Sequence, residues 1–190
     1  MSELRTNRIV PRDGLPAGSA GGIIQVKSTT MTTSVTYGPF SGMPWTEVTP
    51  LTTTITPTRS DSKILVMLTM GGLSSNGNGQ RYGVALRRDS TNIGVNSDGS
   101  NHTRANWAYT GRAIGNAVES HPTFNHLDSP GTTSAVSYKV MITSESTGFY
   151  LYVNRSENDS DSSSVFRTAS SLTLMELSLI HISEPTRRWS

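Results

Sequence analysis

Four histidines and a few scattered carboxylates are the residues of this sequence that could do chemistry. His121 and His126, followed by Asp128 in the stretch HPTFNHLD, hold the donor atoms that a metal ion would need. Their five-residue spacing suits no common helical or strand site, and Pro122 interrupts regular structure between them. Surface or packed histidines are therefore the favoured interpretation, and we expect no metal ion and no cofactor.

The carboxylates suggest two further chemistries, and both patterns are incomplete. In SENDSDSSS (156–164), Asp159 and Asp161 have the oxygen spacing of a calcium loop, but the loop glycine and the closing glutamate of an EF-hand are missing. A solvated polar loop between two strands is favoured instead. Glu119 and Asp128 are the nearest pair for glycoside cleavage, and no serine lies in a G-x-S-x-G elbow. We therefore expect no enzymatic activity.

The loops offer binding groups in place of catalytic ones. They are rich in Gly, Ser, Asn and aromatic residues, a composition that binds by stacking and by adaptable hydrogen bonding. Trp107 and Tyr109 are the first candidates, since exposed aromatic rings stack on sugars and anchor interfaces. Trp107 fits a place in the hydrophobic core equally well. Polar residues of the loops complete the set of binding candidates: Asn76, Asn78, Asn101 and His102.

Composition excludes several classes of protein. The 190 residues include no cysteine, which rules out disulfides, thiol catalysis and cysteine-ligated zinc. The net charge is only +2 and no basic run is interleaved with aromatic residues, so we expect no nucleic-acid partner. No stretch approaches the roughly 20 apolar residues of a membrane span. The N-terminus lacks the apolar segment of a secretory signal, so we expect neither membrane insertion nor secretion.

The elements that must position these loops are predicted to be strands. Residues 1–21, rich in Gly, Pro and charge, indicate an extended arm or linker, and order is expected from GIIQVKS onward. The continuous apolar run at 62–70 has the pattern of a central strand buried on both faces. Residues 82–95 have the pattern of a hairpin. Further strands are predicted at the following ranges: 45–57, 81–89, 134–144, 148–156 and 169–177.

The alternation within these runs predicts which side chains face the core. They are Tyr82, Val84 and Leu86 in the run 81–89; Val136, Tyr138, Val140 and Ile142 in 134–144; Phe149, Leu151 and Val153 in 148–156; and Leu172 and Leu174 in 169–177. Residues 105–118 fit either a short helical turn or a strand and loop, with Gly111 and Gly115 favouring the latter. With about eight to ten strands in all, the sequence predicts an all-β domain. Its architecture is an antiparallel β-sandwich (jelly roll) over residues 22–177 with an extended N-terminal arm.

Five stretches of the sequence, in a fixed order, carry a resemblance to a known family. The first is the opening SELRTNRIVPRDGLPAGSAGGIIQV. The others are VTPLTTTITPTRSDSKILVML, LRRDSTNIGV, HLDSPGTTSAVSYKV, and LYVNRSENDSD followed by ASSLTLMEL. In this order they resemble tail-fibre and virion structural proteins of marine bacteriophages, in which the first stretch corresponds to the arm and the start of the folded domain. Together they cover nearly all of residues 1–176. No such motif matches the loops at 71–80, 95–112 and 116–126, where a receptor site is expected.

The resemblance implies that the protein has a structural role in the virion. Such a protein would be made in the host cytoplasm and then assembled into the particle. The arm would join other virion proteins, and the sandwich would contact a glycan or protein of the host surface. Domains of this kind resemble the tumour necrosis factor-like jelly roll, which implies a homotrimer; Tyr150 and Tyr152 would supply an apolar face for it. The alternatives are a fibre-type glycan depolymerase and a capsid decoration or head-fibre protein.

The C-terminal stretch LSLIHISEPTR (177–187) resembles a translated sequencing adapter over all eleven residues. We therefore expect residues 178–190 to be a non-native tail and Met175 and Glu176 to close the fold, while Leu177 fits either origin. A genuine tail is the alternative. Re-amplifying the gene from its source separates the two, since an identical 3′ end would refute the adapter origin.

Overall fold

The computed structural model describes residues 22–98, 101–111, 118–145 and 147–178, and every helix or strand within them is a β-strand. The predicted arm (1–21) and all but the first residue of the predicted tail (178–190) lie outside the described residues. No helix able to cross a bilayer occurs in the described part of the chain. The strands are β1 (Ile23–Met31), β2 (Val35–Tyr37), β3 (Thr46–Ile55), β4 (Lys63–Thr69), β5 (Leu73–Ser75), β6 (Arg81–Arg88), β7 (Thr91–Ile93), β8 (Trp107–Thr110), β9 (Thr123–Asp128), β10 (Val136–Ser144), β11 (Leu151–Val153) and β12 (Ser170–Leu177).

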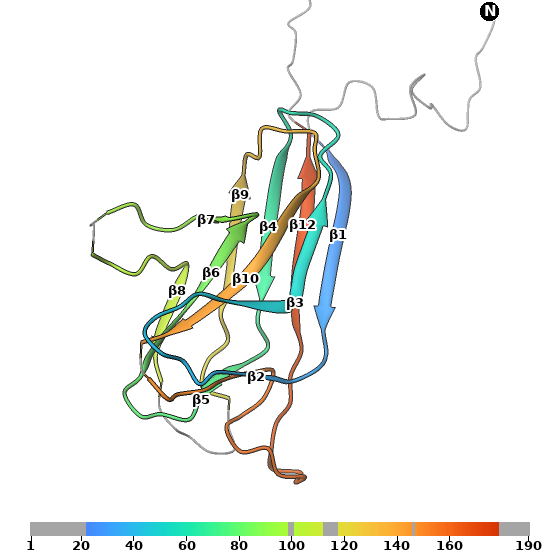
Figure 1. Cartoon of the computed structure of the whole chain (residues 1–190). Coiled ribbons are helices and arrows are strands. Elements are labelled where there is room, and N and C mark those ends of the chain that lie inside the picture. The colour runs from blue at the N-terminus through green and yellow to red at the C-terminus, as the bar shows by residue number, and fades with distance from the viewer. Residues whose placement is uncertain (1–21, 99–100, 112–117, 146, 179–190) are drawn as a thin grey trace, which may run out of the picture.

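Two antiparallel sheets make up the sandwich (Figure 1). One has the strand order β1-β12-β4-β9, and the other has the order β3-β10-β6-β7, with β8 also paired to β6. The chain passes from one sheet to the other along β1, β3, β4, β6, β9, β10 and β12, which is the winding of a jelly roll. The small sheet β2-β11-β5 lies at the lower end in Figure 1. The predicted antiparallel jelly-roll sandwich is confirmed.

The core lies between the two sheets, and the predicted alternation places most of its side chains correctly. Tyr82, Val84 and Leu86 of β6 are buried, as are Val136, Tyr138, Val140 and Ile142 of β10 and Leu172 and Leu174 of β12. The predicted hairpin is confirmed by the antiparallel pairing of β6 with β7. Successive side chains of a strand point to opposite faces of the sheet, so every second residue reaches the core. A slip of one residue would turn the apolar side chains to the solvent, and these runs therefore specify their own register.

The prediction for residues 62–70 was correct in place and wrong in burial. β4 is a central strand, but only Ile64, Val66 and Leu68 are buried, while Leu65 and Met67 are partly exposed on the outer face. No element of the described chain covers that outer face as a helix would in a parallel sheet. The strand β4 therefore has two apolar faces, and a single copy of the chain buries only one of them.

The strand predicted at 148–156 is shorter in the structure, which limits it to Leu151–Val153. Asn154 ends it: its backbone has a φ of 62°, and its side-chain amide donates to the carbonyl oxygens of Met31 and Thr33 at 2.9 and 3.1 Å. Leu151 and Val153 are buried as predicted. Phe149, Tyr150 and Tyr152 are partly buried, and the Arg155 guanidinium lies 4.1 Å from the centre of the Tyr152 ring.

The chain enters and leaves the sandwich at the same end, where a buried carboxylate joins three segments. The Ser178 N–H donates to the Gly22 carbonyl at 3.0 Å, and β1 pairs with β12 along its length. Glu176 of β12 is fully buried. It accepts hydrogen bonds from Gln25 of β1 and from Thr58 and Ser62 of the β3–β4 connection. This network fixes the end of the fold at which residue 22 lies.

Candidate functional site

A pocket of about 280 Å³ lies on the outer face of the sheet that contains β6 and β10. It is formed where β6 begins and β10 ends, and the connections before β3 and between β7 and β8 close its sides. Its lining consists of Met43, Arg81, Tyr82, Gly83, Asn101, His102, Thr103, Ala105, Ala108, Thr143 and Glu145. The pocket is therefore built from four segments that are far apart in the sequence.

Small side chains and one unsatisfied hydroxyl line the inner part of the pocket. Gly83 and Thr143 lie opposite each other in the β6–β10 register. A Cβ added to Gly83 would lie 3.3 Å from the Ala105 Cβ, so glycine keeps this space open. The Thr143 hydroxyl oxygen is buried and has no hydrogen-bond partner among the described residues. Leaving a buried hydroxyl without a hydrogen-bond partner costs about 1–3 kcal/mol of folding free energy. Thr143 is therefore a candidate for contact with a ligand.

An ion pair forms the polar rim. The Arg81 Nε lies 2.9 Å from Glu145, and the Arg81 backbone N–H donates to the same carboxylate at 3.0 Å. These hydrogen bonds hold the pKa of Glu145 below its ordinary value. The pair therefore presents a fixed acceptor and a fixed donor with little net charge.

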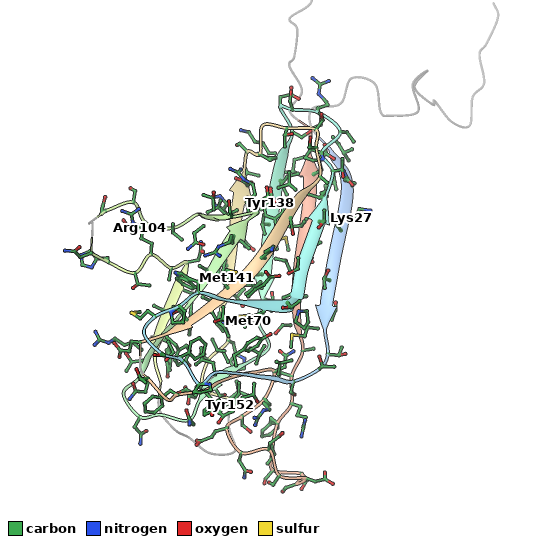
Figure 2. The ribbon with its side chains drawn as sticks, in the orientation of Figure 1. Lys27, Met70, Arg104, Tyr138, Met141 and Tyr152 are labelled. Atoms are coloured by element: carbon green, nitrogen blue, oxygen red, sulfur yellow. The ribbon has the colours of Figure 1, made fainter. Side chains whose placement is uncertain are left out.

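Asn106 ties the base of the connection between β7 and β8 to the sheet. Its side-chain oxygen accepts from the Leu86 N–H at 2.7 Å, and its amide donates to the carbonyls of Ile93 and Gly94, both at 3.0 Å. Thr103 contacts the Met43 sulfur at 3.5 Å, which joins this connection to the one before β3. Figure 2 shows Arg104 on this projecting connection, away from the two sheets.

Two of the predicted binding residues, Asn101 and His102, line the pocket, and the two aromatic candidates do not. Trp107 and Tyr109 alternate along β8 with Ala108, which faces the pocket, so their side chains project to the other side of the strand. There they form an aromatic group with Tyr82, with ring centroids 5.7–6.0 Å apart. Trp107 packs against the core, while Tyr109 keeps 39% of its surface exposed.

The predicted residues of the 71–80 loop lie apart from this pocket. Asn76 is partly buried, and its side-chain oxygen accepts from the Tyr150 N–H at 2.9 Å, so it fixes the start of β11. Asn78 is exposed, and its carbonyl accepts from the Gln80 side chain at 3.2 Å. The six candidates therefore do not form one site.

The carboxylates considered for glycoside cleavage do not converge. Asp128 follows Glu119 by nine positions of mostly extended chain, a span of about 25 Å. Glycosidase pairs are about 5–9.5 Å apart. Glu119 accepts from the Tyr82 hydroxyl at 2.9 Å, and Asp128 accepts from Arg88 at 2.9 Å and from Tyr138 at 2.7 Å. Burial and the Asp128 carboxylate raise the pKa of Tyr138, which stays a neutral donor.

The histidines and the acidic loop show no metal arrangement within the described residues. No group of three His, Cys, Asp or Glu side chains there could hold a metal ion. The His121 Nδ1 lies against the Gly71 carbonyl, and His126 lies on β9 opposite Val66. Asp159 of the loop at 156–164 pairs with Arg167 at 2.6 Å.

A second surface feature is an apolar row across the outer face of the sheet β1-β12-β4-β9. The register aligns Val26 with Met175, Met175 with Leu65, and Leu65 with Leu127. Val26 and Leu127 are 50% and 53% exposed, and the two inner members are partly exposed. We call these four side chains the apolar row. Contiguous apolar surface of this kind marks interaction sites.

Sequence reasoning missed Arg81, Glu145, Thr143 and Gly83. Each is an ordinary residue within or beside a predicted strand. The available signal was the antiparallel pairing of the runs 81–89 and 134–144, which places Arg81 beside Glu145 once the register is known.

No protein-family model matches the chain, and no curated protein does. One solved structure that it resembles is that of the infectious bursal disease virus Gx strain, with 11% sequence identity and a TM-score of 0.37. The match covers 93% of this chain and 47% of that chain, so this chain spans about half the length of that viral protein.

Proposed function

We propose that this chain is a virion structural protein, a tail-fibre-like module that contacts the host surface. The ordered series of five stretches that resemble bacteriophage fibre proteins supports the virion role. The single observation that supports the host contact is that the pocket and the ends of the folded chain lie at opposite ends of a long strand. Gly22 and Ser178 meet at one end, and the pocket lies where β10 finishes, at the far end of a nine-residue strand.

A module anchored through its N-terminal arm would hold this pocket away from the particle. β10 begins beside Ile55, close to the Glu176 network, and ends at Ser144 beside the pocket. At about 3.3 Å per residue the strand separates the two by about 25–30 Å. The described residues of the connection between β7 and β8, some of which line the pocket, project sideways from the sandwich in Figure 1. Such an arrangement suits a recognition site on a rigid scaffold.

The apolar row supports assembly into a homotrimer. Its four side chains carry no charge, and the next register row, Ser28 to Thr173, is also uncharged. Burying an apolar face between copies under closed symmetry leaves no open end for filament growth. The partly exposed Tyr150 and Tyr152 lie on a different surface, around β11 in the small sheet. The apolar row is therefore the better-supported surface for the trimer.

Immunogold labelling tests the virion role. Antibody raised against the recombinant chain is expected to label purified particles of the phage that encodes it, at the fibre tips. Particles that bind no antibody refute the proposal. Label distributed over the capsid shell refutes the tail-fibre assignment and favours the decoration or head-fibre alternative.

A further inference from the structure

We propose that the pocket between β6, β10 and the β7–β8 connection binds one neutral sugar ring of the host surface. The inference rests on the proposed function, since it names the ligand of the host contact. It starts from the Thr143 hydroxyl, which is buried beside the pocket and lacks a partner among the described residues. In the proposed complex Thr143 adopts another side-chain rotamer, which turns its hydroxyl toward the pocket.

The size and lining of the pocket favour a single ring. At about 280 Å³ it lies just below the usual range of ligand pockets, which suits a monosaccharide and not a longer chain. Gly83, Ala105 and Ala108 leave room for the ring's apolar face, and Met43 provides a flexible apolar wall. A sugar ring offers that combination of one apolar face and many hydroxyl groups.

The polar groups around the pocket favour a neutral ligand over an anion. The Arg81 guanidinium is already compensated by the Glu145 carboxylate at 2.9 Å. An ionised carboxylate accepts hydrogen bonds and repels an acidic sugar. Glu145 and the Asn101 side-chain oxygen can accept from ring hydroxyls, while Arg81, the Asn101 amide and Thr143 can donate. Each of these groups matches a hydroxyl, which both donates and accepts.

Binding of simple methyl glycosides to the purified full chain tests the proposal. The probes are the methyl glycosides of glucose, galactose, mannose and N-acetylglucosamine, with glucuronate and N-acetylneuraminate as acidic comparisons. In amide NMR titrations, at least one neutral probe should shift the Gly83 and Ala105 signals, with a dissociation constant on the order of 1 mM. Failure of all four, or tighter binding of an acidic sugar, overturns the proposal.

Three variants separate a role in binding from a role in folding. Thr143→Val keeps the side-chain shape and removes the hydroxyl, so binding should weaken about tenfold while the Tm stays equal or rises. Thr143→Ser keeps the hydroxyl and should bind within about twofold of the original chain. Gly83→Ala narrows the pocket beside Ala105 and should also weaken binding. Unchanged affinity in Thr143→Val refutes the assignment of this site.

The outcomes are independent of the test of the proposed function. If particles are labelled but no neutral sugar binds the pocket, the host-contact module stands and its ligand is of another class. If a neutral sugar binds as expected but particles carry no label, the site stands and the virion role fails.

Discussion

Replacing Glu176 by glutamine tests whether the buried carboxylate stabilises the end of the sandwich where the chain enters at residue 22. One carboxylate oxygen, Oε1, accepts three hydrogen bonds of 2.7 Å, from the Thr58 N–H, the Thr58 hydroxyl and the Ser62 hydroxyl. The other, Oε2, accepts one of 2.6 Å from the Gln25 amide. Burial raises the pKa of Glu176, but these four donors outweigh it, so the pKa lies below the ordinary value of 4.5.

The expected loss in the free energy of unfolding follows from the hydrogen bonds that a glutamine at position 176 could make. With its oxygen in the Oε1 position it keeps three bonds but loses their charge assistance, and its NH₂ group faces the Gln25 donor. Gln25 can rotate its amide to accept, but then gives up its 2.7 Å bond to the Thr56 carbonyl. Bonds to a charged group contribute about 1.5–3 kcal/mol and are not additive, so we expect a loss of about 2–3 kcal/mol. For a domain of this length that lowers the Tm by about 4–12 °C.

Thermal unfolding followed by circular dichroism at pH 7 and at pH 3 is the assay. A carboxylate whose folded pKa is depressed stabilises the fold above its unfolded pKa, and that contribution is lost as pH falls through the folded pKa. The Tm difference between Glu176→Gln and the original chain should therefore be largest near pH 7 and shrink below about pH 4. Glu47→Gln is the matched control: its partly exposed pair with Lys139 is expected to contribute less than about 1 kcal/mol.

Two results would refute this reasoning. One is a Glu176→Gln protein that melts within about 1 °C of the original chain at pH 7. The other is a Tm difference that stays the same at pH 3. The first would mean that water replaces the network at no cost, and the second that the effect comes from packing and not from the charge.

Three further predictions concern the core, the assembly and the C-terminus. Tyr138→Phe removes the donor to Asp128 that crosses between the sheets and should lower the free energy of unfolding in urea by about 1–2 kcal/mol; an unchanged midpoint would contradict it. If the chain forms the proposed trimer, the double variant Leu65→Ser, Leu127→Ser should shift its mass in light scattering to that of a monomer without unfolding the chain, and a variant that stays trimeric would exclude the apolar row as the interface. Deleting residues 179–190 should leave the Tm within about 1 °C, because β12 ends at Leu177; a large loss would contradict the adapter origin.

The strands could be predicted because their signal is local. β6, β10 and β12 each alternate with period two, and a strand that does so specifies its own buried face. The burial of β4 was predicted wrongly because an apolar run has the same pattern whether its second face is covered by the chain or left open. Glu176 occupies an inward position of β12, after Leu172 and Leu174, and a charge at that position was an unused signal of a buried network.

The pocket could not be predicted because it depends on pairings between distant segments. Arg81 and Glu145 are 64 positions apart, and only the β6–β10 register brings them together. Trp107 and Tyr109 were chosen for their chemistry, but which side of β8 they occupy depends on the strand that β8 joins. Asn101 and His102, chosen as polar loop residues, line the pocket, but no pocket could be predicted from them because its other walls come from distant strands.

The pairing of β1 with β12 also has a mechanical consequence. Under the proposed arrangement, a bound host surface would pull at the pocket while the particle pulls at Gly22, and the force would run along β1. The interstrand hydrogen bonds between β1 and β12, whose register runs from Ile23 opposite Leu177 to Met31 opposite Ser170, would then be loaded together in shear and not broken one after another. A module attached in this way would resist detachment forces along its long axis far better than forces that peel β1 sideways from the sheet.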